Sequence, residues 1–126
     1  MYMRYTLIVT GDNFEPEKIL NNIDTKLIDT GLNVDGIGDG RIDFMHKNIF
    51  SREYPDLEYD DEFINFLEKN HAVFLDYGAD NFSILMDVYY ADQCNFEIFN
   101  KALLAKLAKY EVSIPISVFY IGDEHV

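Results

Sequence analysis

The sequence is short of cysteine, of basic residues and of long apolar runs. Cys94 is the single cysteine among 126 residues, so no disulfide can form within the chain, which fits a reducing compartment. No segment reaches the roughly 18 consecutive apolar residues that a membrane helix needs, and the first ten residues hold no long apolar run. We therefore expect a cytoplasmic protein that does not enter a membrane.

Basic residues are few and scattered. Ten lysines and arginines stand against 23 acidic residues, which gives a formal net charge of −13. Such a charge repels phosphate backbones and anionic membranes and attracts basic proteins. The composition is 48% hydrophobic, with ten phenylalanines and nine tyrosines, so the chain is not of the disordered class. Its length suits one domain, which we expect to span residues 1–126.

The second half of the chain predicts two strands joined by a helix. Residues 81–90 alternate between apolar and polar side chains, as a half-buried strand does. Residues 96–110 carry apolar side chains at steps of three and four, which predicts an amphipathic helix with Asn95 as its N-cap. Residues 113–121 alternate again. A crossover of this kind makes the two strands parallel if they share a sheet.

The first half contains another strand and two further helices. Residues 3–9 alternate, and Pro16 suits the first position of a short helix that follows the Gly11 turn. Residues 60–70 have an apolar face and acids in the first turn, which predicts a helix. Residues 72–77 fit either an extension of this helix or an extended connection.

The middle of the chain is rich in glycine. We expect residues 29–41 to be loop-like with some hairpin character, and residues 42–45 to form a short strand. Together the elements predict an α+β protein, a ferredoxin-like two-layer sandwich with the helices packed on one face of a mixed sheet. The opposite face of the sheet would be partly polar and partly aromatic, with Ser83, Asp87, Tyr89, Ser117 and Phe119.

Asp29-Thr30-Gly31 is the one tripeptide that matches a catalytic motif. Aspartic proteases place Asp-Thr-Gly at their catalytic turn, where two carboxylates share a proton. A chain of this length would have to dimerise to supply the second carboxylate. The helices predicted downstream do not suit that all-β fold, so a polar turn is the preferred interpretation.

No spacing in the sequence indicates a metal or cofactor site. His46, His71 and His125 lie far apart, and Cys94 has no second cysteine. A calcium loop that begins at Asp35 would lack ligands at its third and twelfth positions. We expect no metal and no cofactor.

The stretch 53–63 combines acids with aromatic side chains. Six of its first ten residues are acidic, and Tyr54, Tyr59 and Phe63 lie among them. Acids can steer a basic protein toward this surface, and tyrosines can anchor it by burying aromatic area. The alternative is a solvated loop and helix start, in which the acids serve the helix dipole and solubility. The predicted partner-binding residues are Tyr54, Asp56, Glu58, Tyr59, Asp60, Asp61 and Glu62.

Residues 5–17, Tyr-Thr-Leu-Ile-Val-Thr-Gly-Asp-Asn-Phe-Glu-Pro-Glu, resemble the start of the bacterial family called domain of unknown function 4279. In that family a strand ends in Gly-Asp, an aromatic residue follows, and Pro-Glu opens a helix. The strand, helix and strand of residues 81–120 are similar to the family's back half. The glycine-rich middle departs from it, because the family's Pro-Thr and Lys-Gly region is absent. The resemblance implies an α+β domain of unassigned chemistry, similar to the small acidic immunity proteins that accompany bacterial toxins, with no catalytic residues to carry over.

Taken together, the sequence predicts a binding protein and not an enzyme. We expect an acidic immunity or inhibitor protein that neutralises a basic bacterial toxin, a nuclease, by covering its active site or substrate groove. It would act as a monomer or homodimer and would bind no nucleic acid. Two alternatives stay open: a small enzyme of the aspartic-protease type at Asp29, and a structural or oligomerisation domain.

Overall fold

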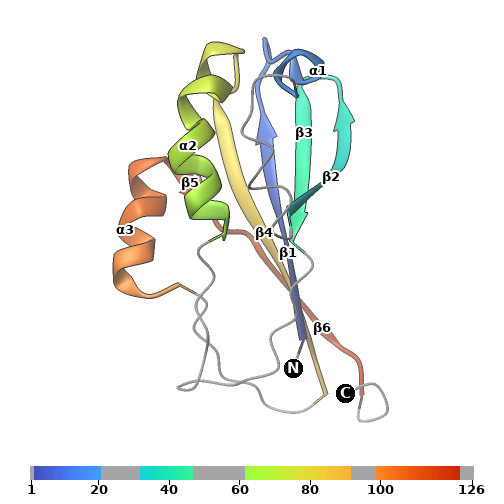
Figure 1. Ribbon diagram of the computed structural model, residues 1–126. Coiled ribbons are helices and arrows are strands. Elements are labelled where there is room, and N and C mark those ends of the chain that lie inside the picture. The colour runs from blue at the N-terminus through green and yellow to red at the C-terminus, as the bar shows by residue number, and fades with distance from the viewer. Residues whose placement is uncertain (1, 21–31, 47–61, 92–98, 123–126) are drawn as a thin grey trace.

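A computed structural model describes residues 2–20, 32–46, 62–91 and 99–122 (Figure 1). In these ranges three helices and a six-stranded mixed sheet form an α+β structure, so the predicted class is confirmed. The strands are β1 (Tyr2–Thr10), β2 (Leu32–Gly38), β3 (Arg41–His46), β4 (Asn81–Tyr90), β5 (Val112–Ser113) and β6 (Ile116–Tyr120). The helices are α1 (Pro16–Ile19), α2 (Glu62–Asp76) and α3 (Lys101–Lys109).

The sheet has the order β2-β3-β1-β4, and both β5 and β6 lie beside β4. β1 runs antiparallel to β3 and to β4, and β2 pairs with β3 as an antiparallel hairpin. β4 runs parallel to β6, which confirms the crossover predicted through the last helix. The hairpin character expected for residues 29–41 is confirmed by this pairing of β2 with β3. The expectation of a loop was wrong for residues 32–38, which form β2, because cross-strand pairing with β3 overrides the low strand propensity of glycine.

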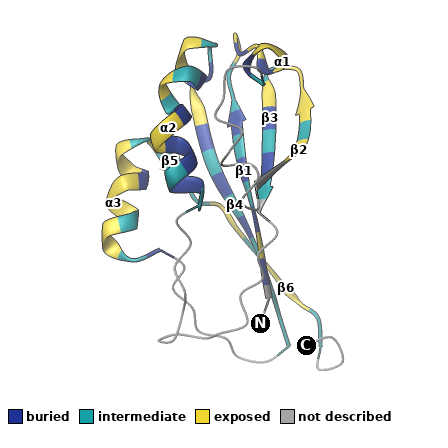
Figure 2. Ribbon diagram, viewed as in Figure 1, coloured by how far each residue is buried: buried dark blue, intermediate teal, exposed yellow. Residues whose placement is uncertain are grey.

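The core lies between the helices and one face of the sheet (Figure 2). Alternate residues of β1, namely Met3, Tyr5, Leu7 and Val9, are fully buried, as their period of two predicted. Aromatic rings join the two layers. The ring of Phe44 on β3 lies 4.8 Å from that of Phe66 and 6.1 Å from that of Phe74, both on α2. Tilted and edge-on rings at these distances add stabilisation beyond the buried area itself.

α2 continues through residues 72–76, which decides between the two interpretations of that stretch in favour of a helix. The reason is tertiary, since Phe74 lies in the core against Phe44 and Phe82. Gly78 ends the helix with a φ of +97°, a left-handed conformation that a residue with a Cβ rarely adopts. Its N–H donates to the carbonyl of Leu75 at 3.0 Å.

α3 begins later than the sequence predicted. Its N-cap is Asn100, whose side chain accepts a hydrogen bond from the Leu103 N–H at 3.0 Å. The predicted cap, Asn95, lies outside the described residues. The last predicted strand is divided in two, because Ile114 and Pro115 separate β5 from β6. The Pro115 carbonyl still accepts from the Met86 N–H at 2.9 Å, so the chain stays against β4 across the break.

Candidate functional site

The binding stretch predicted from the sequence falls almost wholly outside the described residues. Of its seven members only Glu62 is described; it opens α2 and is half-buried. A carboxylate there suits the positive end of the helix dipole. The other six, Tyr54, Asp56, Glu58, Tyr59, Asp60 and Asp61, lie outside the described residues, as does Asp29 of the Asp-Thr-Gly tripeptide, and both interpretations stay predictions.

Three turns meet at one end of the described structure. They are residues 11–15 after β1, residues 39–40 between β2 and β3, and residues 77–80 between α2 and β4. Backbone hydrogen bonds join these turns to one another and to β1: Gly11 N–H to Gly40 O at 3.1 Å, Glu15 N–H to Tyr77 O at 3.1 Å, and Asp80 N–H to Thr10 O at 2.9 Å. Segments far apart in the sequence are thus fixed against each other at this end.

Close backbone contacts explain why glycines occupy these turns. A Cβ on Gly11 would collide with the Gly78 carbonyl, and a Cβ on Gly78 would collide with the carbonyl of Asn13. Gly40 has a φ of +66°, and a Cβ there would lie 2.6 Å from the Gly11 carbonyl. Because only glycine allows this approach, the three turns form a tightly packed and conformationally restricted platform.

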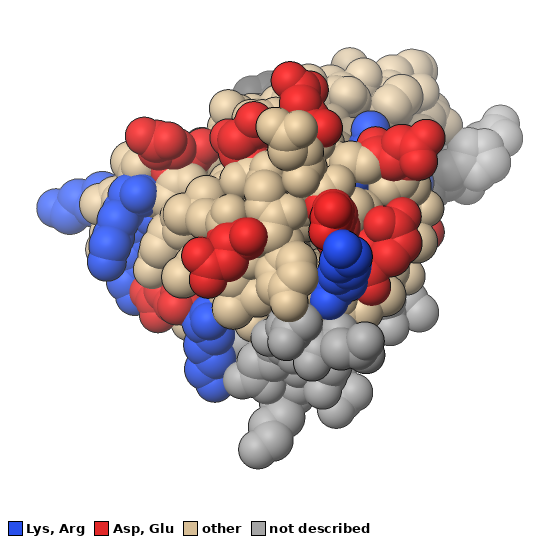
Figure 3. Space-filling view, turned by 90° about the horizontal axis from the view of Figure 1, so that it is seen from above, with Lys and Arg blue, Asp and Glu red and all other residues tan. Residues whose placement is uncertain are grey.

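This end of the molecule is strongly acidic. Figure 3 views it directly and shows Asp and Glu spread across the surface, with most Lys and Arg toward one side. We call the following exposed carboxylates the acidic end: Asp12, Glu15, Glu17, Asp39, Asp76 and Asp80. Among the described residues only Glu15 of this set has a basic partner, Lys18, whose Nζ lies 2.7 Å away. The other five carboxylates are exposed and have no basic partner in the described ranges.

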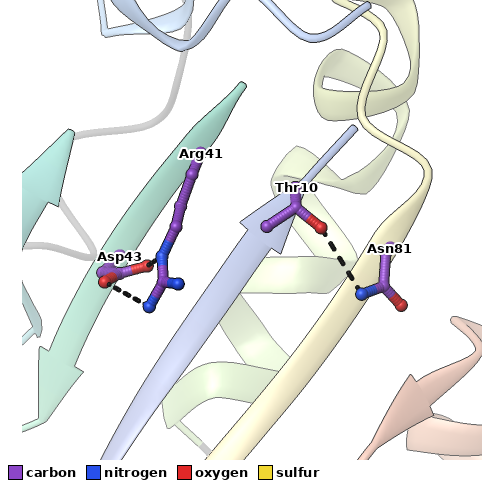
Figure 4. A network of polar contacts seen from close by, with 4 residues as sticks. All are labelled: Thr10, Arg41, Asp43 and Asn81. Carbon is purple, nitrogen blue, oxygen red and sulfur yellow. Dashed lines mark hydrogen bonds and ion pairs between the residues drawn. The ribbon is translucent and has the colours of Figure 1, made fainter. Parts of the chain in front are cut away.

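Local electrostatics keeps the acidic end negative. The carboxyl end of α2 points to it, with no basic residue in the last turn, so the helix dipole adds negative potential. Glu15 raises the pKa of Lys18 through a hydrogen bond and its charge. The nearby cation Arg41 is likewise held by Asp43, with N–O distances of 2.8 and 3.0 Å (Figure 4), and this contact raises the Arg41 pKa.

The open face of the sheet is mixed in character, as the sequence predicted. Beside Arg41, the Asn81 amide approaches the Thr10 hydroxyl at 3.4 Å (Figure 4). At the far end of the sheet the rings of Tyr89 and Phe119 stack at 5.0 Å with an interplanar angle of 16°. This face therefore presents a short aromatic pair among polar side chains.

The described ranges bring together no group of three or more His, Cys, Asp or Glu side chains that could hold a metal ion. None of the helices in these ranges is long and apolar enough to cross a membrane. What the acidic end offers is a concentrated negative field on a fixed backbone, which suits attraction of a basic surface.

Sequence reasoning missed the acidic end because its residues are dispersed along the chain. Each contributing turn does carry a local signal, since an acid stands beside or near a glycine in Gly11-Asp12, Asp39-Gly40 and Gly78-Ala79-Asp80. That pattern predicts three polar turns. Only the order of the strands brings the three turns to one end.

Comparison with models of known protein families, with curated proteins and with solved structures finds no match. The likeness of residues 5–17 and 81–120 to domain of unknown function 4279 stays a prediction from the sequence.

Proposed function

We propose that this protein is an acidic binding protein that neutralises a basic partner. The observation that carries the proposal is the acidic end, whose carboxylates lie in or directly beside three interlocked turns, and five of the six have no basic partner among the described residues. A rigid surface whose charges all have one sign raises the rate at which proteins of the opposite charge associate with it. A negative surface of this kind also disfavours anionic ligands. The role is one of binding and not of catalysis.

The partner class that best fits is a nuclease toxin, and the protein would then be its immunity protein in the cytoplasm. Nucleases bind phosphate backbones and therefore present basic surfaces. An acidic protein that covers such a surface competes with the nucleic acid. The predicted stretch from Tyr54 to Glu62 would add tyrosine anchors to this steering, and the family resemblance points to the same class.

The finer description of the fold as ferredoxin-like is part of the proposal. It is supported by the element order β1-α1-β2-β3-α2-β4, the β-α-β-β-α-β run of that class. It is also supported by the position of β3 between β1 and β2 in the sheet. α3, β5 and β6 then extend this unit at the β4 edge.

The test begins with capture of partners from the host on the immobilised protein, at low and high salt, followed by stopped-flow association of the purified partner. We expect a basic partner whose association rate falls steeply as salt rises. Reversing Glu17 and Asp39 to Lys should slow association about tenfold or more at low salt. Both side chains are exposed, and neither makes a polar side-chain contact with another described residue that the substitution would remove.

The matched control is the reversal of Asp60 and Asp61 to Lys, which changes the net charge by the same amount in the predicted stretch. If only the reversal of Glu17 and Asp39 slows association, the acidic end is the steering surface. If only the reversal of Asp60 and Asp61 does so, the predicted stretch is the steering surface. Equal small effects would indicate net charge alone. Failure to recover any basic partner that elutes with salt would contradict the proposed function.

A further inference from the structure

The two edges of the sheet are built differently. β2, at one edge, carries Asp35, and its pairing with β3 shifts register between Val34 and Gly36. Charges and irregularities of this kind prevent an edge strand from pairing with another chain. β6, at the other edge, has neither. Its sequence Ile-Ser-Val-Phe-Tyr pairs with β4 in continuous register, and no charged residue occurs from Val112 to Gly122.

Apolar side chains are unusually exposed along β6. Ile116, Val118 and Tyr120 are 53%, 59% and 66% exposed, and they share the face that Met86 and Val88 use to enter the core. Phe119, stacked on Tyr89 on the opposite face, is 43% exposed. A neutral strand with exposed apolar side chains on both faces has the character of an interface.

The backbone of β6 also has its hydrogen-bonding groups directed outward at these positions. Pro115 accepts from Met86 at 2.9 Å, and the Ile121 N–H donates to the Tyr90 carbonyl at 2.8 Å. The N–H and C=O of one residue point to the same side of a strand, and those of the next residue point to the opposite side. These two contacts therefore direct the backbone groups of the odd-numbered residues of β6 toward β4. The N–H and C=O groups of Ile116, Val118 and Tyr120 therefore face the edge of the sheet that no described strand covers.

We propose that β6 pairs antiparallel with β6 of a second copy, joining two sheets across a two-fold axis at Val118. In this register Val118 faces Val118 of the second copy, and Ile116 faces Tyr120, so every outward N–H and C=O finds a partner. The small side chain of Ser117 faces the ring of Phe119. The strand is thus complementary to itself in both hydrogen bonding and side-chain size.

Charge favours a second copy over a basic partner at this edge. A basic protein is drawn to the acidic end and finds no carboxylate from Val112 to Gly122. Each copy carries a net charge of −13, so the arrangement must also limit repulsion. Antiparallel pairing sends the two acidic ends in opposite directions. At about 3.3 Å per residue along β4, the two acidic ends of the dimer lie on the order of 45 Å apart. This distance is several Debye lengths at physiological salt, so the repulsion between the two ends is screened.

The test is sedimentation equilibrium of the full chain from about 1 to about 200 µM, a range over which a reversible dimer shows its concentration dependence. We expect the wild type to reach twice the monomer mass. Val118→Lys should raise the dissociation constant about 100-fold or more, because the two-fold axis brings two ammonium groups together in the interface. Added salt should strengthen the dimer because it screens the repulsion between two acidic copies. It should weaken the attraction to a basic partner, so failure of the dimer and failure of the proposed function can be told apart.

Val34→Lys is the matched control, since it places the same substitution on the other edge strand and should leave the dimer intact.

Amide hydrogen exchange then shows which backbone N–H groups of β6 are hydrogen-bonded. In the dimer the amides of Ile116, Val118 and Tyr120 should be protected, and Val118→Lys should expose them while Ser117 and Phe119 stay protected by β4. A monomeric wild type, or a Val118→Lys variant as dimeric as the wild type, would overturn the inference. Loss of partner binding by a monomeric protein on Val118→Lys would assign the edge to a partner strand instead.

Discussion

His71 on α2 shows how a single side chain links packing to proton binding. Its ring lies 4.8 Å from the ring of Phe82 on β4 and 4.8 Å from that of Tyr110 at the end of α3. Burial lowers the His71 pKa below its ordinary value of 6.5, and the charge of Glu111 and the backbone of Tyr110 offset part of that effect. The neutral imidazole is therefore the form that the folded state prefers.

This preference makes stability depend on pH. Because the folded-state pKa is below 6.5, the unfolded chain binds more protons than the folded one as the pH falls through that value. We expect the free energy of unfolding, measured in urea, to fall between about pH 7 and about pH 5, the range in which histidine titrates. His71→Phe keeps an aromatic ring and should reduce this slope. An unchanged slope would assign the pH dependence to other groups.

At the scale of elements, α3 depends on its cap. The helix spans nine residues, too few to be stable alone in water, and only Leu107 among them is fully buried. The Asn100 side chain satisfies the Leu103 N–H, and Lys106 and Lys109 in the last turn suit the helix dipole. Lys106 also contacts Glu68 of α2 at 3.0 Å.

Asn100→Ala should therefore lower the free energy of unfolding by about 1 kcal/mol, the typical value of an N-cap side chain. Asn100→Asp keeps an oxygen that accepts from Leu103 and should stay within a few tenths of a kcal/mol of the wild type. Urea unfolding of the three proteins measures both differences. If the Asp variant lost as much stability as the Ala variant, the cap would not be the cause.

Elements were predictable where a local period extends without interruption. β1 and β4 alternate over their whole length, and both fold as the sequence indicates. β2 was not predicted as a strand, since Gly36, Gly38 and Asp35 weaken every local signal for one. It forms because β3 supplies a partner, and that pairing is a contact between segments, not a property of either.

At the scale of the whole molecule, the net charge of −13 works against the compact state. The fold gathers the carboxylates of the acidic end at one end of the molecule, whereas the unfolded chain separates them, so folding costs electrostatic free energy. Raising NaCl from about 0.01 M to about 0.15 M shortens the Debye length from about 30 Å to about 8 Å and screens this repulsion. We expect the free energy of unfolding to rise over that range.

The variant Glu17→Gln with Asp39→Asn tests where the repulsion arises. It removes two charges from the acidic end without changing side-chain size, and Asn is as well suited to the turn as Asp. We expect it to be more stable than the wild type at about 0.01 M NaCl and to depend less on salt. The measurement is urea unfolding at the two salt concentrations. A salt response equal to that of the wild type would show that the acidic end is not its source.

The sequence by itself determined which side of each long strand is buried, the class of the fold, the parallel crossover from β4 to β6 and the sign of the charge. These follow from the composition and from the local period that the long strands and the last helix carry. The tertiary structure alone decided that three turns converge at the acidic end and that β6, with Ile116 and Val118, lies at an edge that no other described strand covers. The physical reason is that strand order and exposure depend on contacts between distant segments, and an apolar alternating strand has the same sequence signature whether or not a neighbour covers it.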